Sequence, residues 1–377
     1  MRRCNPTTRD SKRAASKPPF SICTHYICLL AIICCLSCAS TTSTDVPGLR
    51  ETVEKFQKDH GLPGIIVYDS FGVGDTVAVA DDGRAGITDS VLFQHVRIAS
   101  ITKTITTTAA LLLVKSGHLQ LNKPIADYLQ GRAAYDSITI GMLCANASGI
   151  GEYFEHPAFQ EQLDNDPLHQ WSDEELIQMG FDRPRLFAPG TSKSYSNTNY
   201  VLLGKLIEVV TGMSLQDFFQ QKIFEPLGMR NSYYPADNEG HLRQPRARGW
   251  FKRNGTLSEV QEFSPTIAQG AGAVISTLHD LIIWSREVVD GSLIGTDLQS
   301  QRLTTSPMPP NNTLGVEYGL GVSKFRGWIG HNGAFPGFQL TMYRHPVSLR
   351  TVIIIVPLYD DDMPHYGDTF FLEYIKP

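Results

Sequence analysis

Ser100 and Lys103 are spaced for nucleophilic chemistry, just ahead of an apolar run at residues 109–114. If a helix begins at Ser100, the two side chains lie one turn apart on the same face, and the amine can reach the hydroxyl. A serine hydroxyl attacks a carbonyl carbon only when a base takes its proton, and a lysine is such a base when desolvation or a nearby cation lowers its pKa. The spacing therefore predicts an activated serine, although a helix-capping serine followed by a solvated lysine has the same pattern.

Two other polar stretches supply partners for this pair. Residues 189–200 form a polar turn ahead of an apolar helical pattern, and Tyr195 within it can move a proton if a cation such as Lys103 stabilises its phenolate. Asn197 can hold both the lysine and a substrate amide. Residues 330–337 are glycine-rich and join two predicted strands, and an edge strand there would offer its backbone to an extended acyl substrate.

The elements that must position these residues include strands near both ends of the body of the chain. Alternating apolar patterns and turn signals predict them at residues 64–68, 76–79, 93–98, 318–323, 328–331, 338–343 and 351–356. Helical spacing and capping pairs such as Ser172 with Glu175 predict a helical, loop-rich middle. We therefore expect an α/β fold of the α+β type, an antiparallel sheet flanked by helices and built from both ends of the chain.

An inserted, mostly helical lobe is expected between the two halves of this sheet. Its predicted bounds are residues 118–269, and the sheet lobe comprises residues 49–117 and 270–377. Ligand sites commonly lie in clefts between such parts. The cleft is therefore where we expect the serine, the tyrosine and the glycine-rich stretch to meet.

The first 39 residues have the pattern of a secretory signal peptide. A basic region precedes the apolar segment 27–36, which is too short to span a bilayer stably. Two forms of processing are open: cleavage after Ala39 would release the protein, whereas lipidation of Cys38 would tether it to a membrane through the Ser/Thr-rich residues 40–48. In both cases we expect an exported protein, periplasmic or secreted.

Composition excludes several classes of function. The leader contains six of the 33 basic and one of the 38 acidic residues, so its removal leaves 27 and 37, a net charge of −10 that does not favour nucleic acid. Six of the seven cysteines also lie in the leader, so there is no disulfide framework. The sequence has no metal-binding histidine spacing, no Gly-x-Ser-x-Gly elbow and no phosphate-binding glycine loop. We expect no metal or other cofactor, and no pattern in the chain indicates an oligomeric state.

Three motifs, in chain order, resemble those of the serine β-lactamase and penicillin-binding protein superfamily: Ser100-Ile-Thr-Lys103, Tyr195-Ser-Asn197 and His331-Asn-Gly333. Further stretches resemble the branch that holds class C β-lactamases, D-alanyl-D-alanine carboxypeptidases and related esterases: residues 187–190, 194–199, 271–276 and 318–321. The resemblance spans about residues 50–357, and it implies the β-lactamase/transpeptidase-like fold.

The resemblance also implies a two-step acyl transfer. Ser100 would attack a carbonyl, Lys103 and Tyr195 would handle the proton, and water would then release the acyl group. The backbone N–H groups of Ser100 and Ala334 would form an oxyanion hole, whose loss typically costs about 10²–10³ in rate. Asn197 would orient the substrate amide and the lysine.

The third motif departs from the family pattern at the expected substrate contacts, which are His331, Asn332, Gly333 and Ala334. Class C β-lactamases usually carry a lysine at the position of His331, where it holds the substrate carboxylate, and a histidine is mostly neutral at pH 7. In the carboxypeptidase pattern, threonines stand at the positions of Asn332 and Ala334. Lys324 and Arg326 are the candidates to replace the missing cation.

The leading hypothesis is an exported serine hydrolase that forms an acyl-enzyme on an amide, of the D-alanyl-D-alanine carboxypeptidase type, with a cell-wall peptide or another small molecule as substrate. An esterase or a class C-like β-lactamase with the same apparatus is the second hypothesis. The third is a catalytically silent protein that binds peptidoglycan or a partner protein, which the intact serine, lysine and tyrosine disfavour.

Overall fold

A computed structural model describes residues 48–71, 74–309, 315–361 and 365–375. The predicted signal peptide, Cys38 and nearly all of the predicted tether lie outside these residues. Within the described ranges, no helix combines the length and the apolar character that crossing a membrane would require.

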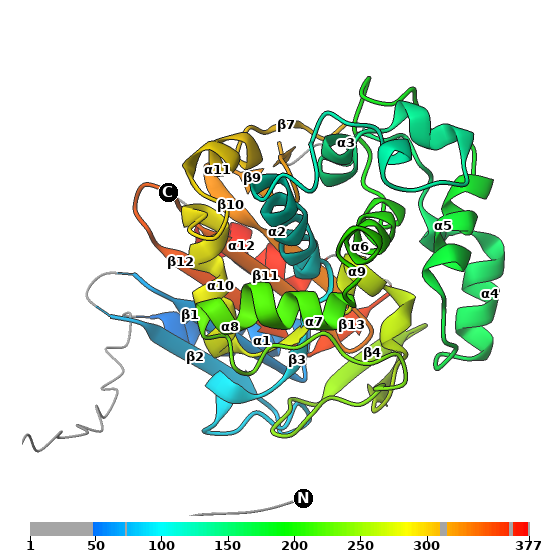
Figure 1. Cartoon of the computed structure of the whole chain (residues 1–377). Coiled ribbons are helices and arrows are strands. Elements are labelled where there is room, and N and C mark those ends of the chain that lie inside the picture. Colours follow the sequence, from blue (N-terminus) through cyan, green and yellow to red (C-terminus); the bar gives the residue numbers. More distant parts are fainter. Residues whose placement is uncertain (1–47, 72–73, 310–314, 362–364, 376–377) are drawn as a thin grey trace, which may run out of the picture. The chain divides into compact units, whose positions relative to one another are not determined.

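Eight strands form the main sheet, in the order β2-β1-β12-β11-β10-β9-β8-β7. Figure 1 shows the blue strands β1 and β2, from the start of the described residues, beside the orange and red strands from near their end. The pairing is antiparallel, with Ile66 of β1 opposite Ile355 of β12, and this confirms the predicted sheet. The bounds are Gly64–Asp69 (β1), Thr76–Asp81 (β2), Ser306–Pro307 (β7), Glu317–Tyr318 (β8), Ser323–Phe325 (β9), Trp328–Phe335 (β10), Phe338–Arg344 (β11) and Thr351–Val356 (β12).

Helices cover both faces of this sheet, so its strands are apolar on both sides. Alternate residues of β1 enter different cores: Ile65 and Val67 lie in a core with residues of helices α1 (Leu49–His60) and α12 (Tyr366–Tyr374). Ile66 and Tyr68 lie in the other core, with residues of α2 (Thr102–Lys115) and α10 (Leu278–Asp290). The helix that follows the candidate serine is therefore anchored on the central sheet.

The middle of the chain is largely helical, as predicted. Ser172 forms a capping box with Glu175 at the start of α5, and α6 ends at Gly212, which has a φ of 67°. The remaining helices are α3 (Ile140–Cys144), α4 (Pro157–Asn165), α5 (Asp173–Asp182), α6 (Thr198–Thr211), α7 (Leu215–Phe219), α8 (Glu225–Leu227), α9 (Gln269–Gly272) and α11 (Thr296–Arg302).

Three details differ from the sequence-based expectation. The strand predicted at residues 318–323 is mostly a turn, because β8 ends at Tyr318 and β9 begins at Ser323. The strand predicted at residues 93–98 is only the two-residue β3 (Val96–Arg97), paired with β6 (Ile275–Ser276) in a separate small sheet. The predicted helical lobe also contains a hairpin, β4 (Gly249–Arg253) and β5 (Thr256–Val260), which joins β13 (Leu358–Asp360). The intervening Asn-Gly dipeptide is a strong hairpin signal that could have predicted it.

Candidate active site

Ser100 lies in a tight turn rather than at the first residue of an α-helix. A 3₁₀ turn covers Ala99–Ile101, and α2 begins at Thr102. Ala99 has a φ of 50°, a left-handed conformation that costs energy for a residue with a Cβ and is typically found at functional sites. The turn keeps the predicted one-turn spacing, since Lys103 Nζ lies 2.9 Å from Ser100 Oγ.

Lys103 is fully buried and contacts three oxygen atoms. Besides Ser100 Oγ, its Nζ donates to Asn197 Oδ1 at 2.6 Å and to the Ala271 carbonyl at 2.8 Å. These last two oxygens can only accept, whereas the serine hydroxyl can accept or donate. A neutral amine can thus keep both fixed partners and aim its lone pair at the serine proton.

The surroundings of Lys103 make this neutral form accessible near pH 7. Burial lowers the pKa of the Lys103 amine to about 7, and the negative charge of Glu152 opposes this shift. Burial in turn raises the pKa of the Glu152 carboxyl, whereas the hydrogen bonds that the carboxyl accepts from Asn197 lower it. The amine is therefore poised as a general base near neutral pH.

Glu152 is a site residue that the sequence reasoning missed. Its Oε2 accepts from the backbone N–H of Asn197 at 2.7 Å and from Asn197 Nδ2 at 3.0 Å. Its Oε1 accepts from the Phe154 N–H at 3.0 Å. A single carboxylate in a loop carries no distinctive signal in the sequence, and only the fold places it behind the asparagine.

Tyr195 lies over the amine, with its ring centre 4.9 Å from Lys103 Nζ. Tyr195 is 36% exposed, but desolvation at the floor of the site raises its pKa above the usual value, the neighbouring Tyr318 adds to this, and the interaction of its hydroxyl with Ser100 opposes it. The phenol is therefore protonated at neutral pH. The phenolate that a cation such as Lys103 could stabilise would form only during proton transfer, and the hydroxyl is placed for such a relay.

A groove with a volume of about 320 Å³ opens beside Ser100, Tyr195 and Asn197. Its other wall includes the part of β10 at Asn332, Gly333 and Ala334. Strand β9 pairs with β10 only as far as Gly330, so the rest of this edge carries no strand partner among the described residues. The structure thus brings six of the eight predicted site residues to one groove. The two exceptions are Lys103, which is buried beneath the groove, and His331.

Gly333 is needed for this close approach of β10 to the nucleophile. A Cβ at this position would lie 2.6 Å from the Ile98 carbonyl oxygen and 3.0 Å from the Ser100 backbone nitrogen. Contacts under 3.0 Å are not tolerated, so only glycine lets the strand run so near the catalytic turn.

His331 lies in a neighbouring pocket and is nearly fully buried. Its Nδ1 contacts the Asn332 carbonyl at 2.5 Å, which can only accept, so the proton is on Nδ1 and Nε2 accepts from the Tyr318 hydroxyl at 3.0 Å. Burial, together with the neighbouring Lys103, lowers the pKa of His331 to about 3. The imidazole is neutral and offers no charge to a substrate carboxylate.

Lys324 and Arg326, the predicted substitutes for the missing cation, are not among the residues that line the groove or the neighbouring pocket. Lys324 pairs with Glu317 at 3.4 Å, and Arg326 lies over the ring of Phe325. The prediction that one of them replaces the lysine is therefore wrong for this structure. In the part of the chain that the structure describes, no cluster of His, Cys, Asp or Glu could hold a metal ion.

Comparison with known proteins agrees with this geometry. The protein-family model described as Beta-lactamase matches residues 49–357. Penicillin-binding protein 4 of Amycolatopsis lactamdurans is 31% identical over 255 residues, which cover 64% of this chain and 63% of that protein. The D-alanyl-D-alanine-carboxypeptidase/endopeptidase AmpH of Escherichia coli (strain K12) is 26% identical over 56% of this chain and 53% of its own length. The aligned part is thus less than two thirds of these relatives.

A solved structure covers more of the chain. A D-stereospecific amidohydrolase from Streptomyces sp. superposes with a TM-score of 0.75 and 27% sequence identity, over 83% of this chain and 94% of that one. The mixed helical and antiparallel-sheet architecture predicted from the sequence is therefore that of known amide-hydrolysing relatives.

Proposed function

This chain belongs to the Beta-lactamase family of serine hydrolases, and we propose that it is an exported acyl-enzyme hydrolase that cleaves amide bonds next to D-amino acids. The observation that carries the proposal is the placement of Lys103 Nζ, 2.9 Å from Ser100 Oγ and bound to two oxygens that can only accept. The D-stereospecific amidohydrolase and the carboxypeptidase/endopeptidase among its relatives support the choice of bond.

Acylation begins when neutral Lys103 takes the proton of Ser100 and the serine oxygen bonds to the carbonyl carbon of the substrate. The charge that develops on the carbonyl oxygen is held by the backbone N–H groups of Ser100 and Ala334. Tyr195 passes the proton from Lys103 to the leaving nitrogen as the C–N bond breaks. Asn197 holds the substrate amide and keeps the amine in place.

Deacylation reverses these proton movements. A water molecule attacks the carbonyl carbon of the ester and gives a proton to the pair of Tyr195 and Lys103. The ester bond then breaks, and the oxygen of Ser100 takes a proton back from the same pair. The groove that carries both steps has walls from residues of the predicted sheet lobe and of residues 118–269. We propose these two lobes as the functional division of the protein.

Export of the protein is part of the same proposal. A basic region followed by the apolar segment 27–36 supports secretion, and attachment to a membrane through Cys38 remains the alternative to release after Ala39. Mass spectrometry of the mature N-terminus distinguishes a lipidated Cys38 from a free terminus.

The test is covalent labelling of the purified protein with a fluorescent penicillin, followed by turnover of peptides with L- and D-alanine at the scissile bond. We expect a label on Ser100, located by peptide mapping, and cleavage of the D-peptide alone. Ser100→Ala should lose both. Neither label nor turnover with any substrate, with Ser100→Ala indistinguishable from the wild type in binding peptidoglycan, would overturn the proposal in favour of a binding protein.

An esterase or a β-lactamase is the second candidate, because the same serine, lysine and oxyanion groups serve an ester or a β-lactam equally well. Turnover of p-nitrophenyl butyrate or of the penicillin at a higher kcat/KM than any D-peptide would assign the protein to that class.

A further inference from the structure

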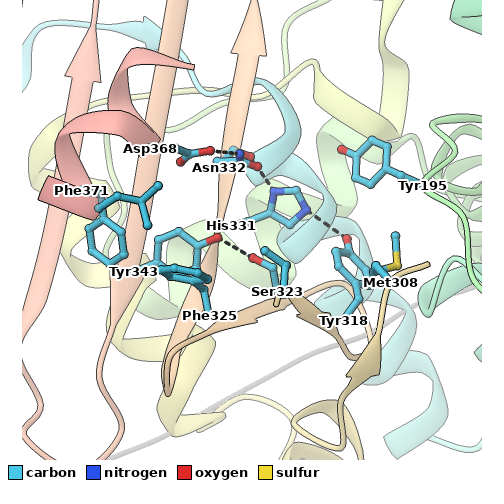
Figure 2. Close-up of a pocket in the computed structure, with 12 residues that line it drawn as sticks. Tyr195, Met308, Tyr318, Ser323, Phe325, His331, Asn332, Tyr343, Asp368 and Phe371 are labelled. Carbon is cyan, nitrogen blue, oxygen red and sulfur yellow. Dashed lines mark hydrogen bonds between the residues drawn. The ribbon is translucent and has the colours of Figure 1, made fainter. Parts of the chain in front are cut away.

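A second pocket, of about 180 Å³, lies next to the catalytic groove. Tyr195 and Asn332 line both spaces, so the pocket adjoins the groove at these two residues. Figure 2 shows Tyr195 at one side of the pocket and Asp368 at the other, with His331 and Asn332 between them. The far wall comes from Phe371 of the C-terminal helix α12 and from other apolar side chains.

The charge in this pocket is negative. Among the described residues that line the groove or the pocket, Asp368 is the one acidic side chain, and no lysine or arginine is among them. His365 lines the groove 3.7 Å from Asp368 Oδ1, but its Nε2 donates to the Gly333 carbonyl at 2.8 Å and its Nδ1 accepts from the Asp368 backbone N–H at 3.2 Å, so this ring is neutral. His331 is neutral, as shown above. Ser323 and Phe325 of β9 line the pocket, and because side chains alternate along a strand, Lys324 between them faces the opposite side.

Hydrogen bonds fix the orientation of Asp368, but they leave its carboxylate able to accept further hydrogen bonds. Its Oδ2 accepts from Asn332 Nδ2 at 2.5 Å, and its Oδ1 accepts from the Thr341 hydroxyl at 2.6 Å. The side chain is 29% exposed. Each carboxylate oxygen can accept more than one hydrogen bond, so the group can also bind a donor from a substrate in the pocket.

We propose that Asp368 determines substrate specificity, such that the pocket accepts an amine-bearing or uncharged group and rejects a carboxylate. A cation there would meet a fixed negative charge and the aromatic ring of Phe371, both of which attract it. A carboxylate would meet a like charge with no compensating cation, an arrangement that strongly disfavours binding. This inference depends on the proposed hydrolase function, and it directs that function toward amides and amine-terminated substrates rather than peptides with a free C-terminal carboxylate.

The test uses two pairs of substrates that differ mainly in charge. N-(4-aminobutyryl)-D-alanine p-nitroanilide and N-succinyl-D-alanine p-nitroanilide place an amine or a carboxylate at the end of a four-carbon group on the acyl side. N-acetyl-D-alanyl-D-alanine amide and its free acid place a neutral amide or a carboxylate on the leaving side. In at least one pair we expect the wild type to prefer the member without the carboxylate by about tenfold or more in kcat/KM. Asp368→Asn should reduce that preference at least about fivefold by raising kcat/KM for the anionic member.

Two controls separate the charge from a structural role. Asp368→Asn keeps the size of the side chain and an oxygen that can accept from Asn332. Glu317→Gln removes a nearby carboxylate that does not line the pocket, and it should leave the preference unchanged. Preference for the carboxylate in both pairs, or a preference that Asp368→Asn does not alter, would refute the inference.

Binding without chemistry distinguishes this inference from the proposed function. Calorimetric titration of Ser100→Ala with the dipeptide amide and its free acid measures selection by the pocket even if no substrate turns over. We expect tighter binding of the amide, and weaker discrimination once Asp368→Asn is added. If the amide binds no more tightly than the free acid, the specificity role of Asp368 is refuted. If Ser100 of the wild type is not labelled, only the proposed hydrolase function is refuted.

Discussion

Glu152 accepts two hydrogen bonds from one residue, Asn197, through its backbone N–H and its side-chain Nδ2. Because the Nδ2 group of Asn197 faces this carboxylate, its Oδ1 faces Lys103, 2.6 Å from Nζ. An ordered chain of hydrogen bonds therefore connects the carboxylate of Glu152 to the hydroxyl of Ser100. It also supplies the negative charge that keeps the pKa of the buried amine from falling further.

Glu152→Gln should shift the pH profile of acylation. Removing the negative charge lowers the pKa of Lys103 below about 7. On the acidic side of the pH profile, kcat/KM rises as the amine loses its proton, so this rise should move to lower pH. The plateau should fall about tenfold or more, because a glutamine whose oxygen accepts from Asn197 turns its NH2 group toward the Phe154 N–H, which then has no acceptor. Glu155→Gln, at an exposed carboxylate paired with Arg183, is the matched control. A rise that stays in place or moves to higher pH would contradict the role of Glu152.

Lys103→Ala should reduce the rate of acylation by about 10² or more, the usual effect of losing a general base. The rate is measured with the fluorescent penicillin by stopped-flow, and intact-protein mass spectrometry reports the adduct. Lys115→Ala, at the other end of the same helix, should acylate normally. If Lys103→Ala acylates at the wild-type rate, the base is Tyr195 instead.

Tyr195→Phe should keep the ring packed beside the amine and remove only the hydroxyl. Since the phenol is protonated at rest, its loss should impair proton delivery to the leaving nitrogen, by about 10²-fold or more for amides. An activated ester, whose leaving group needs no proton, should be affected much less. An equal loss for both classes of substrate would assign Tyr195 to another step.

Gly333→Ala should damage both the catalytic turn and the stability of the fold. The new methyl group would clash with the Ile98 carbonyl and approach the Ser100 nitrogen. Such overpacking costs about 1–3 kcal/mol in the free energy of unfolding, measured by urea denaturation. Labelling of Ser100 should be lost under conditions where the variant is still folded. A folded variant that labels at the wild-type rate would show that β10 can move away without harm to the site.

Much of the architecture and the reacting groups could be predicted from local patterns in the chain. The serine and lysine spacing, the capping pair at α5 and the strands at both ends are encoded by residues close together in sequence. The hairpin β4–β5 was predictable as well, because its Asn254-Gly255 turn is a local signal.

The sequence by itself determined which groups can react, because a hydroxyl, an amine and a phenol keep their chemistry wherever the fold places them. Only the tertiary structure decided their charge and surroundings. Burial keeps His331 neutral even in mildly acidic solution, Glu152 meets Asn197 across 45 residues of chain, and Asp368 reaches Asn332 from the C-terminal helix. Charge states depend on desolvation and on neighbours that are distant in sequence, and both exist only once the chain has folded.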